Sequence, residues 1–317
     1  MGERKPDLFN NDDSRSSSQD RPKLAISFSG GRTSALMTKM VLDRNKLTHD
    51  IRVTFANTGC EHEDTLRFVN ECDIRFGFAV VWLEADISPE SGVGVRHKVV
   101  SFETASRQGE PYEAFIRKYG IPNRSMPQCT SRLKTEVMES YLKSQGFYRG
   151  KRLNYDTAIG IRADEIDRMS SRHREERLVY PLISAGVRKE DVITYWSQYD
   201  WDLRIPEHLG NCTWCWKKSD RKLFTLAVDY PEVFNFPSRM DATYANLKAK
   251  NGPRRFFRGN RTAQEIMKLA YERPFKKFGE IELFDPTLDT GSACGESCEI
   301  GSDENEMSNT DDSNTGE

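Results

Sequence analysis

The stretch Leu24-Ala25-Ile26-Ser27-Phe28-Ser29-Gly30-Gly31-Arg32-Thr33-Ser34 decides the fold of this chain. Residues 24–28 have the length and apolar content of a buried strand, and residues 35–42 place apolar side chains at helical spacing. The two glycines at the junction permit backbone angles that other residues avoid and let the main chain approach a ligand closely. A strand, a phosphate-binding loop and a helix N-terminus are therefore predicted, with an anionic group as the ligand.

The context of this stretch indicates the class of fold. Residues 51–56 are predicted to form a second strand, 62–75 a helix and 79–83 a third strand. This alternation predicts an α/β fold, a doubly wound parallel sheet that binds ligands at the carboxyl ends of its strands. The loop has neither the Gly-Lys-Ser/Thr ending of a Walker A sequence nor the Gly-x-Gly-x-x-Gly of dinucleotide-binding folds. Taken alone, Ser-Gly-Gly is equally consistent with an ordinary strand-to-helix turn.

Further motifs follow the loop along the chain. They are 57–65 (Asn-Thr-Gly-Cys-Glu-His-Glu-Asp-Thr), 129–134 (Cys-Thr-Ser-Arg-Leu-Lys), 160–165 (Gly-Ile-Arg-Ala-Asp-Glu), 180–182 (Tyr-Pro-Leu) and 212–215 (Cys-Thr-Trp-Cys). Together with the loop, which looks like a PP-loop, they resemble the phosphoadenosine-phosphosulfate (PAPS) reductase-like family of the PP-loop superfamily. The resemblance covers roughly residues 22–225, and the cysteine motifs look closer to sulfurtransferase-type and phage-borne members than to the assimilatory reductase.

The resemblance implies a Rossmann-like domain of the HUP type that binds an adenine nucleotide, either ATP or a sulfonucleotide, together with Mg²⁺. Arg162 offers planar donors for phosphate or sulfate oxygens and Lys134 a point charge, so both are candidate catalytic residues. The expected nucleotide-binding residues lie in the loop and in two later motifs: Ser27, Ser29, Gly30, Gly31, Arg32, Thr33, Ser34, Asn57, Thr58, Gly59, Glu61, Gly160, Arg162 and Glu165.

Three cysteines form a candidate metal-binding set. The Cys-x-x-Cys turn of Cys212 and Cys215 brings two thiolates to one point. Cys129 lies just before a helix expected at 131–144, where the helix N-terminus lowers a thiol pKa. The set favours a [4Fe–4S] cluster with one open iron, unless Cys60 or a C-terminal cysteine supplies a fourth ligand. Structural Zn²⁺ and reduced, buried thiols are the alternatives.

A second cysteine pair lies near the C-terminus. Assimilatory PAPS reductases carry a nucleophilic cysteine in a C-terminal Glu-Cys-Gly-Leu-His element, which Ala293-Cys294-Gly295-Glu296 matches only in part. Cys294 and Cys298 could carry sulfur as a persulfide or resolve a disulfide, so Cys298 is a third candidate catalytic residue. An incidental pair of cysteines is the alternative.

Composition sets the outer bounds of the domain organisation. A chain of 317 residues that is 37% hydrophobic and 30% charged can bury one good core with a smaller appended region. We expect a disordered tail at 1–20, the nucleotide-binding α/β domain with its cysteine cluster at 21–225, a helical basic extension at 226–290 and an acidic disordered tail at 291–317. No apolar run approaches the ~18 to 20 residues that span a bilayer, and no signal peptide is evident, so a cytoplasmic protein without membrane contact is expected.

The charge of the central part bears on possible partners. The first 20 residues contribute −2 and residues 296–317 contribute −8 to the net charge of −2, so the rest of the chain carries +8. Basic residues at 248–261 surround Phe256 and Phe257, a pattern that suits phosphate contact and base stacking. Nucleic acid, tRNA or DNA, is therefore a candidate acceptor, and a basic surface with two buried phenylalanines is the alternative.

Three functions compete on these observations. The first is an ATP-dependent adenylyl-transferring sulfurtransferase, which activates an acceptor with release of pyrophosphate and takes sulfur from an Fe–S cluster or another sulfur donor. The second is a reductase of phosphoadenylyl or adenylyl sulfate that uses a thiol reductant. The third is a nucleotide-binding or nucleic-acid-binding protein that holds structural zinc and has no turnover.

Overall fold

The computed structural model describes residues 21–150, 152–249 and 252–279, and its centre is a six-stranded sheet with the strand order β4-β3-β2-β1-β7-β8. Neighbouring strands from β3 to β8 pair in parallel, whereas β4 is antiparallel to β3. The doubly wound sheet is thus confirmed as mostly parallel, with an antiparallel edge strand that the sequence did not predict. The strands are β1 (Lys23–Ser27), β2 (Asp50–Ala56), β3 (Val80–Ile87), β4 (Val95–Val100), β7 (Tyr155–Ala158) and β8 (Leu178–Val179), besides the small hairpin of β5 (Tyr148–Arg149) and β6 (Arg152–Leu153).

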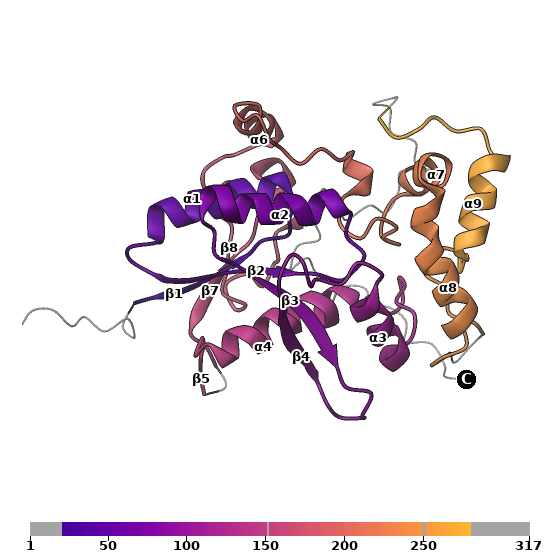
Figure 1. The fold of residues 1–317 in the computed structure, drawn as a ribbon, viewed down its shortest axis with the longest axis horizontal. Helices are drawn as coiled ribbons and strands as arrows, with labels where there is room; N and C mark the ends of the chain where they lie inside the picture. The colour runs from indigo at the N-terminus through magenta and orange to yellow at the C-terminus, as the bar shows by residue number, and fades with distance from the viewer. Residues whose placement is uncertain (1–20, 151, 250–251, 280–317) are drawn as a thin grey trace, which may run out of the picture.

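Helices cover both faces of this sheet (Figure 1). In that view α1 and α2 lie above the strands, with α6 farther out, whereas α3 and α4 lie below them. The helix expected at 131–144 begins as a π-helix, Ser131–Thr135, and continues as α4. The helices are α1 (Arg32–Asn45), α2 (Glu63–Phe76), α3 (Glu110–Tyr119), α4 (Glu136–Ser144), α5 (Pro181–Ser184), α6 (Lys189–Trp196), α7 (Asp220–Asp229), α8 (Asn235–Tyr244) and α9 (Ala263–Glu272).

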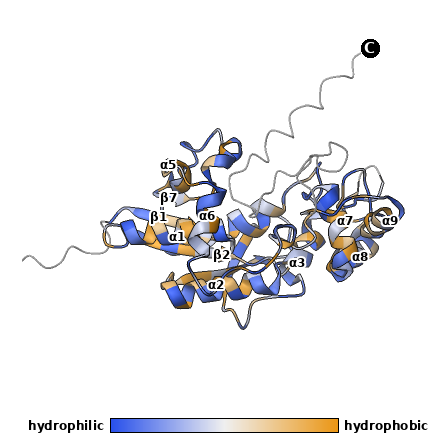
Figure 2. Cartoon of the chain, turned by 90° about the horizontal axis from the view of Figure 1, so that it is seen from above, coloured by the Kyte–Doolittle hydropathy of each residue, from blue (hydrophilic) through white to orange (hydrophobic). Residues whose placement is uncertain are grey.

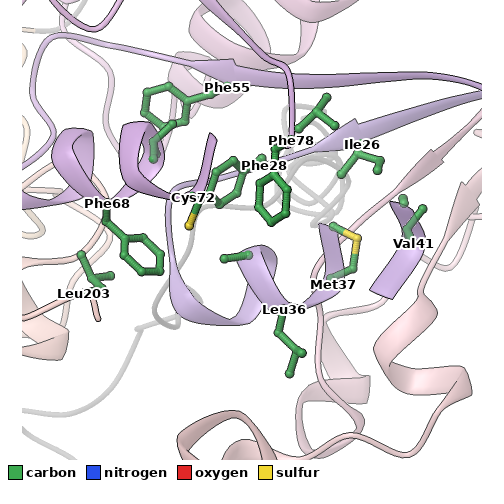
Figure 3. Close-up of a cluster of buried hydrophobic side chains, with 14 of the residues drawn as sticks. Ile26, Phe28, Leu36, Met37, Val41, Phe55, Phe68, Cys72, Phe78 and Leu203 are labelled. Carbon is green, nitrogen blue, oxygen red and sulfur yellow. The ribbon is translucent and has the colours of Figure 1, made fainter. Parts of the chain in front are cut away.

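The main hydrophobic core lies between the sheet and the pair α1 and α2 (Figure 3). Ile26 and Phe28 point into it from the first strand and its end, and both are fully buried. Met37 of α1 and Cys72 of α2 meet them from the helix side. Because parallel strands are covered on both faces, β1 reads as a continuous apolar run, which is why its position was predictable.

A second apolar cluster joins the C-terminal helices to the α/β part. α7, α8 and α9 gather at one end of the molecule, as the view from above also shows (Figure 2). Their apolar side chains share a cluster with Tyr112 and Phe115 of α3 and with Trp214. The domain boundary expected after residue 225 falls inside α7, and the tails expected at 1–20 and 291–317 lie outside the described residues. In the described ranges no helix is long and apolar enough to cross a membrane.

Candidate active site

The topology of the sheet places the predicted loop at its switch point. From β1 the chain proceeds to β2 and β3 on one side, and later returns to β7 on the other side of β1. Loops that leave β1 and β7 at their carboxyl ends therefore diverge and leave a crevice, which is where open α/β sheets bind ligands. The segments in question are 28–31 after β1 and 159–162 after β7.

The loop after β1 ends in an uncapped helix N-terminus. Gly31 is the N-cap residue of α1, has an extended conformation (φ −94°, ψ 162°) and carries no side chain that could cap the helix. The first turn of α1 also contains no acidic residue. The backbone N–H groups of that turn and the helix dipole have the arrangement that an anion site at a helix N-terminus requires, and the binding of an anion here stays a prediction.

Gly30 brings the loop into direct contact with α2. Its φ is +83°, and a Cβ atom at this position would lie 2.8 Å from Cγ2 of Thr65 and 3.0 Å from Cγ2 of Val69. No L-residue with a side chain fits here without strain or displacement of α2. The first glycine of the pair is therefore required by both the backbone angle and the packing.

The hydroxyl groups of the loop stabilise its own conformation. Ser34 Oγ accepts hydrogen bonds from Ser29 N at 3.3 Å and Ser29 Oγ at 2.8 Å, and it donates to the Gly31 carbonyl at 3.0 Å. Thr33 Oγ1 accepts a hydrogen bond from a guanidinium nitrogen of Arg162 at 3.4 Å. These contacts hold the loop open, so the backbone N–H groups are the donors left to bind a ligand.

Arg162 extends from the β7 side of the crevice to the loop. It is 7% exposed, and its guanidinium group lies 3.2 Å from Asp164 and 3.5 Å from Glu165. Burial alone would raise the pKa of Asp164, but its hydrogen bond with Arg162 and the charge of that residue lower the pKa overall. Gly160 makes this approach possible, because a Cβ atom there would lie 2.9 Å from Cα of Ser34. The structure thus brings the 160–165 motif into contact with the phosphate loop.

The side chain of Arg32 points away from this crevice. Its Nε donates to Asp202 Oδ1 at 2.7 Å, and its terminal nitrogen donates to the Leu203 carbonyl. Trp196 Nε1 donates a hydrogen bond to the Arg32 carbonyl at 3.1 Å, which also holds the first turn of α1 in place. The Arg32 side chain therefore attaches the loop to the 196–203 segment, and only its backbone faces a ligand.

The segment after β2 is braced by its own polar residues. Asn57 is fully buried and donates from Nδ2 to Glu84 Oε1 at 2.7 Å and to the Ser106 carbonyl at 2.9 Å. The carboxylate of Glu61 accepts from Thr58 N at 2.9 Å and from the Thr58 hydroxyl at 2.8 Å. Hence Asn57, Thr58 and Glu61 shape the loop through contacts within the protein.

The same segment carries Cys60 to the Cys-x-x-Cys turn. Glu61 and Cys212 form an isolated antiparallel bridge, and Thr213 N donates to the Cys60 carbonyl at 3.0 Å. The Thr58 hydroxyl lies 3.5 Å from Cys212 Sγ. Two distant motifs of the sequence, 57–65 and 212–215, are thus neighbours in space.

Tyr112 of α3 stands among the cysteines that these motifs supply. Burial raises the pKa of its phenol, and the charges of the Cys129, Cys212, Cys215 and Cys60 thiols raise it further. Cys60, Cys129 and Cys212 also pack in the same apolar cluster as this ring. The sequence offered no signal for Tyr112, since it lies outside every motif. The position of Cys60 beside the other thiols supports the earlier suggestion that it is a fourth thiol of the set.

Lys134 approaches the cysteines from the π-helix. It is 8% exposed. Burial, followed by the nearby Glu61 carboxylate, raises the pKa of the Cys212 thiol, and the Lys134 ammonium lowers it in part. A π-turn is a common feature of functional sites, because the extra residue re-aims the side chains around it. Lys134 is thus well placed to stabilise negative charge on the thiol side of the site.

The cysteines have the right chemistry for a metal centre, but their spacing must also fit one. Thiols are the ligands of Fe–S clusters and a frequent choice for zinc, and they lie here in a buried cluster with aromatic neighbours. Across the described ranges, however, no three His, Cys, Asp or Glu side chains are drawn together closely enough to hold a metal ion. Binding would therefore require the thiols of Cys129, Cys212 and Cys215 to move closer together.

The aromatic residues of the 248–261 segment are not available for base stacking. Phe256 is fully buried and packs edge-on against Trp214, and Phe257 is 2% exposed. Arg254 donates to the Tyr119 carbonyl at 2.9 Å and Arg261 to Asp220 at 2.8 Å. The base-stacking hypothesis is wrong for this segment, because the two rings complete the second apolar cluster. Cys294 and Cys298 lie outside the described residues.

Comparisons with known proteins find similarity over most of the chain. Residues 23–177 match the phosphoadenosine phosphosulfate reductase domain family. An Escherichia phage lambda protein, "Uncharacterized nin region protein ORF290", is 34% identical over 282 residues, which are 87% of this chain and 94% of the phage protein. That similarity extends beyond the length of the matched domain.

More distant similarity reaches archaeal proteins and a solved structure. Two uncharacterized proteins of Methanocaldococcus jannaschii are 24% and 25% identical over 229 and 155 residues, and the matches cover 66% and 49% of this chain but only 45% and 26% of the archaeal proteins. The crystal structure of phosphoadenylyl-sulfate (PAPS) reductase from Candida auris, in complex with phosphate, aligns with a TM-score of 0.34 at 15% identity, over 57% of this chain and 74% of that one.

Proposed function

Because this chain belongs to the phosphoadenosine phosphosulfate reductase-like family of PP-loop proteins, we propose that it binds ATP and uses it to activate an acceptor for sulfur insertion. The observation that carries this proposal is the pairing of two sites at one edge of the sheet. One is the uncapped N-terminus of α1, and the other is the group of thiols around Tyr112. An anion site next to thiols suits both activation by a nucleotide and transfer of sulfur.

The loop is the binding site for the β- and γ-phosphates in this proposal. Backbone N–H groups from Gly31 onward bind phosphate oxygens, and the helix dipole adds a partial positive charge. Arg162, which lies against Thr33, stabilises the charge that develops on the α-phosphate. Glu165, whose carboxylate lies 3.5 Å from Arg162, would be a candidate ligand for Mg²⁺, which would supply positive charge to the phosphates.

The chemistry consists of two displacements. An oxygen of the acceptor attacks the α-phosphorus, the bond from that phosphorus to the bridging oxygen breaks, and pyrophosphate leaves with the electron pair. A hydrosulfide from a sulfur donor then attacks the carbon that bears the adenylylated oxygen, and AMP leaves with that oxygen. Most of the rate enhancement comes from positioning and from fixed positive charge.

The thiol side of the site receives the sulfur. A [4Fe–4S] cluster held by Cys129, Cys212 and Cys215 would supply an open iron for a sulfide ligand. Lys134 stabilises negative charge at this point, since its ammonium group already favours the thiolate of Cys212. The protein thus presents the sulfur nucleophile from one side of the crevice and the activated acceptor from the other.

Pyrophosphate release tests the proposal. The protein is purified without oxygen and incubated with ATP, Mg²⁺ and sulfide in the presence of tRNA, duplex DNA or neither. We expect ATP-dependent pyrophosphate release that Arg162→Gln reduces, because Arg162 lies against the phosphate loop at Thr33. Lys143→Gln, at an exposed position on α4, should leave it unchanged. A visible absorption spectrum with an iron and sulfide assay reports on the cluster separately.

Reduction of a sulfonucleotide is the second candidate, and the domain match favours it. In that reaction the same loop holds phosphoadenylyl or adenylyl sulfate, a thiol reductant supplies electrons, and sulfite is released. Sulfite release without pyrophosphate release would replace the first proposal by this one. Zinc in stoichiometric amounts with neither product would indicate a binding protein without turnover.

A further inference from the structure

A cavity of about 250 Å³ lies on the face of the sheet opposite the main core, between the strands and α4. Its floor consists of small side chains on three adjacent strands, Ser27 of β1, Thr54 of β2 and Thr157 of β7. Met138 and Leu142 of α4 form its roof. Ser27 is the one lining residue that the sequence assigned to nucleotide binding, and the lining includes no residue of the uncapped N-terminus of α1.

Hydroxyl groups in this cavity have hydrogen-bonding capacity to spare. Ser27 is 3% exposed, lines the cavity, and makes no side-chain hydrogen bond among the described residues. Thr157 and Thr135 also line the cavity and, within the described ranges, make no hydrogen bond through their hydroxyls. Thr135 and Thr157 are half-buried, and none of these three hydroxyl oxygens is sealed from solvent without a partner, so a ligand in the cavity can replace the water that they bind.

The charge of the lining selects the kind of ligand. Glu139 and Glu176 line the cavity, and no Lys, Arg or His does. Burial, followed by the neighbouring carboxylate of Glu136, raises the pKa of Glu139. Glu176 already accepts a hydrogen bond from Ser170 Oγ at 3.1 Å and lies 3.9 Å from Arg172 Nε. Glu139 is therefore the lining carboxylate that we expect to accept a hydrogen bond from an amine. The apolar roof and the polar floor together suit a flat ring with hydrogen-bonding edges.

The lining of the cavity includes one residue next to each part of the proposed active site. Ser27, the last residue of β1, directly precedes the phosphate loop at 28–31. Thr135, at the other end, directly follows Lys134, whose charge acts on Cys212. A ring bound here could present an oxygen toward the nucleotide and a carbon toward the thiols.

We infer that this cavity binds an amine-bearing heterocycle of nucleobase size, the ring of the acceptor, as a ligand additional to the nucleotide at the phosphate loop. The identification of this ring as part of the acceptor rests on the proposed function, whereas the binding of the ring to the cavity does not depend on turnover. The apolar roof packs on the faces of the ring, the hydroxyls of Ser27 and Thr157 bond to its edge, and Glu139 accepts from its amine.

Calorimetric titration of the full-length protein with adenosine and with cytidine tests the inference. The titrations are done with and without a saturating, non-hydrolysable ATP analogue. We expect at least one nucleoside to bind in the presence of the analogue. Glu139→Gln and Thr157→Val should each weaken that binding about 5- to 10-fold, the value of one lost hydrogen bond, while the affinity for the analogue stays the same.

One matched variant serves as the control, and defined outcomes of the titrations would overturn the inference. Glu190→Gln makes the same substitution at an exposed position of α6, outside the lining, and should change neither affinity; thermal unfolding confirms that all variants are folded. The inference is overturned if neither nucleoside binds, or if both variants bind like the wild type. It is also overturned if the ATP analogue competes with the nucleoside, because the cavity then holds the base of the nucleotide itself. Failure of pyrophosphate release with intact nucleoside binding would instead refute the proposed reaction.

Discussion

Replacement of Gly30 by alanine is the most direct test of the phosphate loop. The residue has a φ of +83°, and its missing Cβ atom would lie 2.8 Å from Thr65, 3.0 Å from Val69 and 3.2 Å from Phe55. An L-residue in this conformation costs about 1–2 kcal/mol. Insertion of a methyl group into packing this tight costs about 1–3 kcal/mol more. Gly30→Ala should therefore lower the free energy of unfolding by about 2–5 kcal/mol.

Gly186→Ala separates these two contributions. Gly186 has a φ of +69°, and no atom lies within 4 Å of its missing Cβ. It should therefore lose only the conformational part, about 1–2 kcal/mol. The difference between the two variants measures the contact of the loop with α2.

Urea unfolding and pyrophosphate titration are the assays for this pair. Gly30→Ala should bind pyrophosphate at least about tenfold more weakly than the wild type, because the loop must shift from the N-terminus of α1. Gly186→Ala should bind it normally. Equal stability of the two variants, with normal pyrophosphate binding by both, would refute the reasoning about how the loop packs.

Three further predictions concern other parts of the molecule. Gly160→Ala places a Cβ atom 2.9 Å from Cα of Ser34, so titration should show weaker pyrophosphate binding; unchanged affinity would mean that the two loops are farther apart than described. Burial raises the pKa of Asp241 from 3.8 to about 6, although its Oδ2 accepts a hydrogen bond from Ala263 N at 2.9 Å. The stability that protonated Asp241 contributes is thus full below pH 4 and is lost as the pH rises through 6. Asp241→Asn should therefore be more stable than the wild type by about 1–2 kcal/mol at pH 7.5 and roughly equal to it near pH 4. Denaturant unfolding at both pH values measures this, and a difference in stability that does not depend on pH would contradict it. Phe256→Ala should lower the free energy of unfolding by about 3–5 kcal/mol, because the ring is fully buried, whereas a variant of normal stability that has lost affinity for single-stranded nucleic acid would restore the stacking hypothesis.

Local sequence patterns predicted the fold because its decisive features are local. The apolar run at 24–28 became β1 and the paired glycines became the start of α1, since period and backbone freedom act within a few residues. The motif at 160–165 was located correctly, yet its contact with Thr33 depends on the pairing of β7 with β1. Residue spacing cannot show which strands will be neighbours.

The roles of individual polar residues were harder to predict from sequence. Asn57, Glu61 and Arg32 have the side chains that bind nucleotides, but in the folded chain they hydrogen-bond to Ser106, Thr58 and Asp202. Each partner is distant in the sequence or lies in an adjacent turn, and nothing in the motif marks it. A polar side chain of the same type can therefore bind a ligand or stabilise the loop, and the hydrogen-bond partner available in the fold determines which of the two it does.

The sequence by itself determined a strand, a glycine turn and a helix whose N-terminus binds an anion, because backbone conformation and hydropathy period are local properties. Only the tertiary structure decided that the Cys60 segment pairs with the Cys212 turn, that Tyr112 packs in one cluster with Cys60, Cys129 and Cys212, and that small residues on three strands leave a cavity under α4. These features arise where segments separated by many residues pack together. Their energies depend on the final distances between side chains, which no local pattern contains.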